Sequence, residues 1–179
     1  RGGRARRGGG GAGQKGGDGR PRRDAQGRTR KRGAGGGPRQ YATKARARRR
    51  RTADPARLVA FEGMRAVARD DAYANLVLPH RIRQRRLDHR DAGFATELTY
   101  GSIRMLGRYD AIVALASGRR IDNIESDVLD VMRLGAHQLL GMRTPTHAAV
   151  SATVELAREV GAHRATGFVN AVLRKVGAR

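Results

Sequence analysis

Between Leu58 and Val176 the apolar side chains recur every three or four positions, which is the period of a helix that buries one face. No stretch in this region alternates apolar and polar residues over four or more positions between turn signals, as a half-buried strand would. Glycine and proline divide the region into segments of helical length joined by short connections. The spacing predicts an all-α domain whose consecutive helices pack antiparallel.

Capping residues mark where several of these helices should begin. Asp54 precedes a proline, so we expect a side-chain cap followed by proline at the first helical position. Asp88 is expected to cap a later helix, and Pro79 either to bend its helix or to mark its start. Gly101 and Gly107 permit close packing or a break within a long third segment. The predicted helices cover residues 55–70, 73–87, 88–117, 124–142, 146–160 and 165–176.

Residues 1–53 differ in composition from all that follows. They hold 19 basic and 2 acidic residues and 15 of the 25 glycines, and Tyr41 is their only aromatic residue. Such a segment cannot bury enough apolar surface to offset the entropy of ordering it. We therefore expect a disordered, basic Arg/Gly-rich tail over residues 1–53 and a folded domain over residues 54–179.

Composition also excludes several classes of protein. The absence of cysteine rules out disulfides, cysteine-bound zinc, iron–sulfur clusters and a thiol nucleophile on this chain. No apolar run approaches the roughly 20 residues that span a bilayer, and the arginine-rich start lacks the apolar core of a secretory signal. The five histidines lack metal-ligand spacing, so packing or capping roles are expected for them. We expect a cytoplasmic protein with no metal, no membrane association and a polyanionic partner.

Arginine clusters indicate where that partner would bind. A block of four arginines closes the tail, and four more crowd the second predicted helix. Arginine pairs with phosphate through two parallel hydrogen bonds and stacks on unpaired bases. The alternative is ordinary surface charge, because Asp70, Asp71, Asp88 and Asp91 are near enough in sequence to pair with these arginines. The candidate RNA-binding residues are Arg48, Arg49, Arg50, Arg51, Arg57, Arg65, Arg81, Arg83, Arg85 and Arg86.

Four motifs follow one another in order. They are DAGFATELTYG at residues 91–101, RLGAHQLL at 133–140, HAAV at 147–150 and GFVNAVLR at 167–174. Together they resemble the NusB-like N-terminal domain of the RsmB (Fmu/Sun) family of bacterial 16S rRNA cytosine-C5 methyltransferases. The resemblance covers residues 54–179 but not the tail. It implies a bundle of about six or seven helices in two halves that binds RNA, here 16S rRNA.

The same resemblance implies a second domain that these residues do not contain. In the family an S-adenosylmethionine-dependent catalytic domain follows, with one cysteine that attacks the cytosine ring and another that helps release the product. This chain has no cysteine and no strand-borne glycine motif, so we expect no catalytic residue and no cofactor on it. The missing catalytic domain would then be its partner, and the parent protein an rRNA methyltransferase. The alternative is a free-standing NusB-type antitermination factor that regulates transcription by binding RNA.

Other polar residues have structural interpretations. His137 and His147 are expected to form hydrogen bonds between helices, and Asn170 to find buried partners. Glu97, Arg104 and Asp110 could be mistaken for acid/base machinery, but ion pairs that hold helices together are expected instead. Arg174 and Lys175 have two open interpretations: they complement the dipole of the last helix, or they contact the RNA or the catalytic domain.

Overall fold

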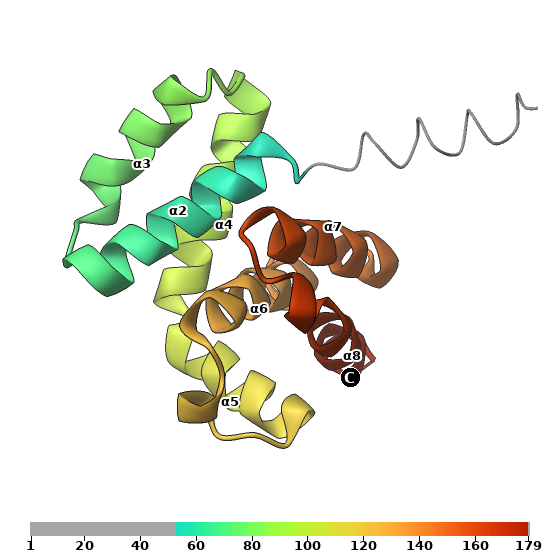
Figure 1. Ribbon diagram of the computed structural model, residues 1–179. Coiled ribbons are helices and arrows are strands. Elements are labelled where there is room, and N and C mark those ends of the chain that lie inside the picture. The colour runs from blue at the N-terminus through green and yellow to red at the C-terminus, as the bar shows by residue number, and fades with distance from the viewer. Residues whose placement is uncertain (1–52, 179) are drawn as a thin grey trace, which may run out of the picture. The chain divides into compact units, whose positions relative to one another are not determined.

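The computed structural model describes residues 53–178, and this part of the chain forms seven α-helices and two short 3-10 helices, with no strand (Figure 1). The predicted all-α fold is confirmed, and the number of helices is at the upper end of what was expected. All of the predicted tail except Ala53 lies outside the described residues, and so does the block Arg48 to Arg51. The elements are α2 (Pro55–Asp70), α3 (Ala74–Gln84), α4 (His89–Arg104), α5 (Leu106–Ser117), η1 (Ile121–Asn123), α6 (Ser126–Leu140), α7 (Thr146–Glu159), η2 (His163–Ala165) and α8 (Thr166–Gly177).

Both predicted caps are confirmed. Asp54 has extended backbone, and its Oδ1 accepts a hydrogen bond from the Ala56 N–H at 2.8 Å, while Pro55 opens α2. The Asp88 Oδ1 accepts from the Asp91 N–H at 2.8 Å at the start of α4. Each carboxylate satisfies one of the backbone donors that a helix leaves unpaired at its N-terminus.

The structure decides between alternatives at two positions: the break that Gly101 and Gly107 were expected to permit is present, and Pro79 does not start its helix. The long third segment is not one helix, because Met105 leaves helical geometry and separates α4 from α5. The break lies between Gly101 and Gly107. Helix α4 packs on α2 and α6, whereas α5 turns to pack on α6 and α8, so a straight helix could not make both sets of contacts (Figure 1). Pro79 lies inside α3 and neither starts nor ends it.

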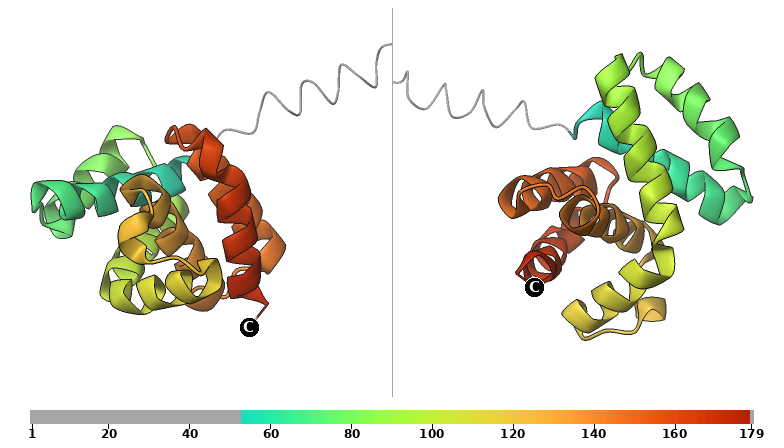
Figure 2. Two further views of the ribbon diagram at one scale, coloured as in Figure 1. Left: turned by 60° about the horizontal axis from the view of Figure 1, so that its bottom comes forward. Right: turned by 180° about the vertical axis from the view of Figure 1, so that it is seen from behind.

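The helices form two groups around a shared core (Figure 2). Helices α2, α3 and α4 make up the first group, and α5 to α8 make up the second. The larger core spans both groups and includes Phe61, Leu98, Val131, Leu156 and Leu173. Helix α6 lies among the others, and ten of its residues are buried. The described part of the domain is therefore organised around α6.

Helix α3 lies at the edge of the first group. Among its residues only Leu78 is buried, and it joins a small cluster with Val59 of α2 and Ala95 of α4. Most of the surface of α3 therefore faces outward, including the positions of its arginines.

Packing begins slightly before the predicted domain boundary. Ala53, the last residue of the expected tail, is 5% exposed and belongs to the larger core. None of the helices within residues 53–178 has the length and the apolar character that crossing a membrane requires.

Candidate nucleic-acid interface

One carboxylate holds two arginines of α3 against α2. Glu62 of α2 forms an ion pair with Arg85, and its Oε2 lies 3.8 Å from the Arg81 Nε. Arg81 also donates to the Gln84 side-chain oxygen at 3.3 Å. Both arginines keep more than a third of their side-chain surface exposed, at 39% and 36%. Glu62 thus orders two guanidinium groups side by side and leaves them accessible.

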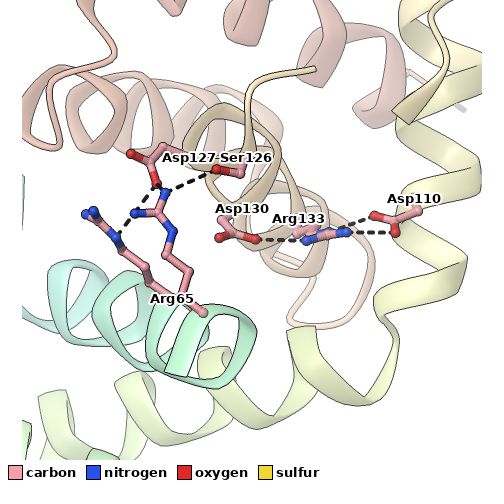
Figure 3. Close-up of polar contacts among 7 residues, drawn as sticks. Arg65, Asp110, Ser126, Asp127, Asp130 and Arg133 are labelled. Carbon is pink, nitrogen blue, oxygen red and sulfur yellow. Dashed lines mark hydrogen bonds and ion pairs between the residues drawn. The ribbon is translucent and has the colours of Figure 1, made fainter. Parts of the chain in front are cut away.

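A second carboxylate orders two arginines at the far end of α2. The Asp127 Oδ1 in the first turn of α6 lies 2.7 Å from an Arg69 guanidinium nitrogen and 3.9 Å from the Arg65 Nε (Figure 3). Arg69 also donates to the Ser126 hydroxyl at 3.1 Å. A shallow groove of about 360 Å³ connects the two sets of arginines, and its lining residues are Glu62, Arg65, Ala66, Arg69, Asp70 and Arg81.

The remaining two arginines of this region have no acidic partner among the described residues. Arg83 and Arg86 are exposed, and Arg86 has a left-handed backbone with φ 51° just beyond α3. The name α2–α3 arginine surface is used for the accessible arginines of α2, of α3 and of the turn that follows α3: Arg65, Arg69, Arg81, Arg83, Arg85 and Arg86. Arg81 and Arg85 face α2, whereas Arg83, two residues from each, lies on the other side of α3.

The acidic partners differ from those that the surface-charge alternative named. Within residues 53–178, no ion pair joins the arginines of this surface to Asp70, Asp71, Asp88 or Asp91. Asp88 caps α4 instead. The partners are Glu62 and Asp127, one of which comes from a distant part of the sequence.

Arg57 lies apart from the α2–α3 arginine surface. Its Nε donates to the Gln138 Oε1 at 2.8 Å, it forms an ion pair with Asp54, and its guanidinium group lies 4.7 Å from the centre of the Phe94 ring. Its side chain is only 16% exposed. Arg57 is therefore engaged in the contact of α2 with α4 and α6.

Three residues of this site were not predicted from the sequence. Arg69 follows Arg65 by four residues and so lies on the same helix face, a spacing that the sequence does display. Glu62 and Asp127 carry no comparable signal, because their role depends on how α2 packs against α3 and α6.

The buried polar groups elsewhere hold helices together. Arg133 of α6 forms hydrogen bonds of 2.6 and 2.8 Å to Asp110 of α5 and of 2.9 Å to Asp130 (Figure 3). Burial raises the pKa of Asp130, and the hydrogen bond from Arg133 partly opposes that change. Burial by itself would lower the pKa of Arg133, but its hydrogen bonds to Asp110 and Asp130 raise it overall. The predicted structural role of Asp110 is confirmed.

His137 is the centre of a second buried cluster. Its Nδ1 lies 2.7 Å from the Tyr109 hydroxyl and its Nε2 lies 3.1 Å from the Glu97 Oε1. Burial raises the pKa of Tyr109, opposed by the charges of Arg108 and Arg104. The inter-helix contacts predicted for His137 and Glu97 are confirmed, although the partner of Glu97 is a histidine and not Arg104.

Two predictions about polar residues are wrong. His147 is exposed and has no inter-helix hydrogen bond among the described residues. Asn170 is only half-buried, and its Oδ1 accepts from Arg174 Nε of the same helix at 3.1 Å. Lys175 of α8 also connects two helices, since its Nζ donates to the Ala116 carbonyl of α5 at 3.2 Å.

No group of three or more acidic or histidine side chains within residues 53–178 could hold a metal ion.

This helical arrangement defines a NusB-like domain. Solved structures with the same fold include antitermination factors NusB and NusE in complex with dsRNA, at a TM-score of 0.63 and 18% identity, with 69% of this chain and 94% of that chain covered. The solution structure of NusB from Aquifex aeolicus matches at a TM-score of 0.57 and 22% identity, with 68% and 84% covered. At these identities the likeness shows the fold alone.

The family follows from the sequence match. The model of the NusB family matches residues 54–178, and the chain belongs to that family.

Several relatives are much longer than this chain. The methyltransferase candidate Rv1407 of Mycobacterium tuberculosis is 53% identical over 137 residues, which are 76% of this chain and 30% of that protein. The ribosomal RNA small subunit methyltransferase B of Pseudomonas putida is 33% identical over 119 residues, which are 66% of this chain and 27% of that protein. The chain thus spans less than a third of the length of these relatives.

Proposed function

We propose that this chain is the RNA-binding part of a longer S-adenosylmethionine-dependent rRNA cytosine-C5 methyltransferase and that it positions the catalytic part on 16S rRNA. The α2–α3 arginine surface is the observation that carries the proposal. The names of the longer relatives support the kind of reaction, and the membership of the NusB family supports the kind of ligand.

The geometry suits RNA for a physical reason. Glu62 and Asp127 hold Arg81, Arg85 and Arg69 in place, so less side-chain entropy is lost when phosphate binds. Arg83 and Arg86 have no acidic partner among residues 53–178 that a phosphate would have to displace. The ordered guanidinium groups that face α2 and the unpaired ones of α3 and its following turn can each bind phosphates and stack on exposed bases.

The methyl donor belongs to another part of the longer protein. Folds that bind such cofactors place them at the carboxyl ends of parallel strands, and residues 53–178 contain no strand. The described residues do not fit the donor, so the proposal assigns them binding and orientation of RNA only.

Arg83→Gln combined with Arg86→Gln tests the proposal in the full chain. The readout is the affinity for single-stranded 16S rRNA fragments across a salt series. Contact of the unmodified chain with about 6 phosphates gives a log–log salt slope near −4, and loss of two contacts makes that slope shallower by about 1.4. We expect the double variant to show this reduced slope and weaker binding.

The matched control is Arg120→Gln combined with Arg143→Gln. It removes the same charge elsewhere, and Arg143 has the same left-handed backbone as Arg86, with φ 53° against 51°. Equal effects of the two double variants would contradict an interface on α3 and indicate nonspecific attraction. If the affinity of the unmodified chain for the rRNA fragments does not depend on salt, the proposal is wrong.

A free-standing antitermination factor is the second candidate, and the fold shared with NusB favours it. The gene sequence beyond the codon of Arg179 separates the two. A following α/β domain with two cysteines supports the methyltransferase, whereas a stop codon within a few residues supports the antitermination factor.

A further inference from the structure

A second polar groove lies between α7 and α8. Its volume is about 620 Å³, within the range of roughly 300–1,000 Å³ that is typical of ligand sites. Val150 and Val154 of α7 contribute its apolar part, and an added Cβ on Gly167 of α8 would touch nothing within 4 Å. The polar side chains that line it are Thr146, His147, Ser151, Glu155, Arg158, Thr166, Asn170 and Arg174.

Two arginines give this groove a positive charge. Arg158 of α7 donates to the Glu155 carboxylate at 2.6 Å, and Arg174 of α8 donates through Nε to the Asn170 oxygen at 3.1 Å. Glu155 is the only carboxylate among the lining residues, and it is already paired. Each guanidinium group is held by one bond and keeps further N–H donors for a ligand.

The groove is distant from the α2–α3 arginine surface. All views place α3 at the opposite end of the described domain from α7 and α8 (Figures 1 and 2). A ligand in the groove would therefore occupy a separate site.

We propose that the α7–α8 groove binds one nucleotide of a single-stranded RNA segment. Its phosphate would lie against Arg158 and Arg174, and its base against Val154. The inference rests on the proposed function for the identity of the ligand and adds a second site to it.

The mixture of groups favours a nucleotide over an acidic peptide. Arg158 and Arg174 can pair with a phosphate or with a carboxylate. The hydroxyl, imidazole and amide groups of Ser151, His147 and Asn170 supply both donors and acceptors, which the edge of a base requires and a carboxylate, an acceptor only, does not. Val154 is half-buried and offers an apolar surface for the face of that base, whereas Val150 lies beneath it at 4% exposed.

Gly167→Leu tests the site without a change in charge. The leucine side chain would extend into open space next to the groove, so α8 can keep its backbone while the base is displaced. With a fluorescent single-stranded RNA of mixed sequence, we expect binding to the full chain to weaken at least about fivefold, because the leucine takes the place of the base, with no change in salt slope.

Arg158→Gln combined with Arg174→Gln tests the charged part. We expect a salt slope shallower by about 0.7, because both arginines contact the same phosphate and one phosphate contact is lost. The Arg120→Gln, Arg143→Gln variant is the control. A titration of the unmodified, isotope-labelled chain with the same RNA needs no variant. In NMR spectra of this titration, the amide resonances of α7 and α8 should shift together with those of α3.

Several results would overturn the inference. If the groove variants bind RNA like the control while Arg83→Gln, Arg86→Gln loses affinity, the groove proposal fails and the proposed function stands. If the resonances of α7 and α8 move with an acidic peptide but not with RNA, the groove is a protein site and the inference is wrong. If the unmodified chain shows no RNA binding, both proposals fail.

Discussion

Gly93 and Gly101 lie on the same helix, α4, but Gly93 faces open space and Gly101 is tightly packed. A Cβ on Gly101 would approach the His137 ring well inside 3.0 Å, a separation that real Cβ atoms do not show, whereas a Cβ on Gly93 would meet nothing within 4 Å. The His137 ring cannot easily move away, because both of its nitrogens have hydrogen-bond partners in Tyr109 and Glu97. The absence of a side chain at Gly101 is what lets α4 and α6 approach each other there.

Gly101→Ala should therefore lower the free energy of unfolding, by about 1–3 kcal/mol, the usual cost of an overpacked core. Gly93→Ala should raise it by about 0.5–1 kcal/mol, because alanine favours the helix and reduces the freedom of the unfolded chain. Urea unfolding followed by circular dichroism measures both. Similar changes for the two variants would show that the His137 ring yields to the added methyl group.

At the scale of elements, one side chain joins three helices. Gln138 of α6 accepts a hydrogen bond from Arg57 of α2 and donates to the Thr153 hydroxyl of α7 at 3.3 Å. It is fully buried, and its amide also donates to the Leu134 carbonyl. Because a buried donor that loses its acceptor is costly, this contact favours one arrangement of α2 and α7 on α6.

Gln138→Leu should lower the free energy of unfolding by about 1–3 kcal/mol, since the Arg57 Nε would lose its acceptor. The same change in an Arg57→Met background should cost less, with a coupling of at least about 0.5 kcal/mol between the two sites. Urea unfolding of the four proteins in this cycle measures the coupling. Additive effects would mean that the two side chains act independently.

For the whole molecule, most of the net charge lies outside the described part of the chain, since residues 1–52 hold 19 basic residues and only 2 acidic ones. The buried apolar residues of the described range run from Ala53 to Val176, whereas residues 1–52 hold 19 of the 38 basic residues. We therefore expect residues 1–52 to contribute to the attraction of RNA and little to the stability of the described domain.

Removal of residues 1–52 should leave the melting temperature of the domain almost unchanged, because no described core residue is lost. The affinity for RNA should fall and its salt slope become shallower, since 19 basic residues are removed. Thermal melting by circular dichroism and the same salt series measure these effects. Loss of cooperative melting would show that the first 52 residues are needed for folding.

The sequence by itself determined the fold class, the family and most helix boundaries. These depend on local patterns: the spacing of apolar residues, the caps at Asp54 and Asp88, and the four short motifs that resemble those of the family. It also pointed to the arginines of α3 as a group.

Only the tertiary structure decided which side chains contact those arginines. It separated Arg57 from the others, because Gln138 and Phe94 reach it from α6 and α4. It made Glu62 and Asp127 the groups that order the arginine surface, and it formed the α7–α8 groove by packing two consecutive helices against each other. The break at Met105 belongs here too, since it follows from where α5 must pack. The physical reason is common to all four: side chains far apart in sequence interact only once the helices have packed.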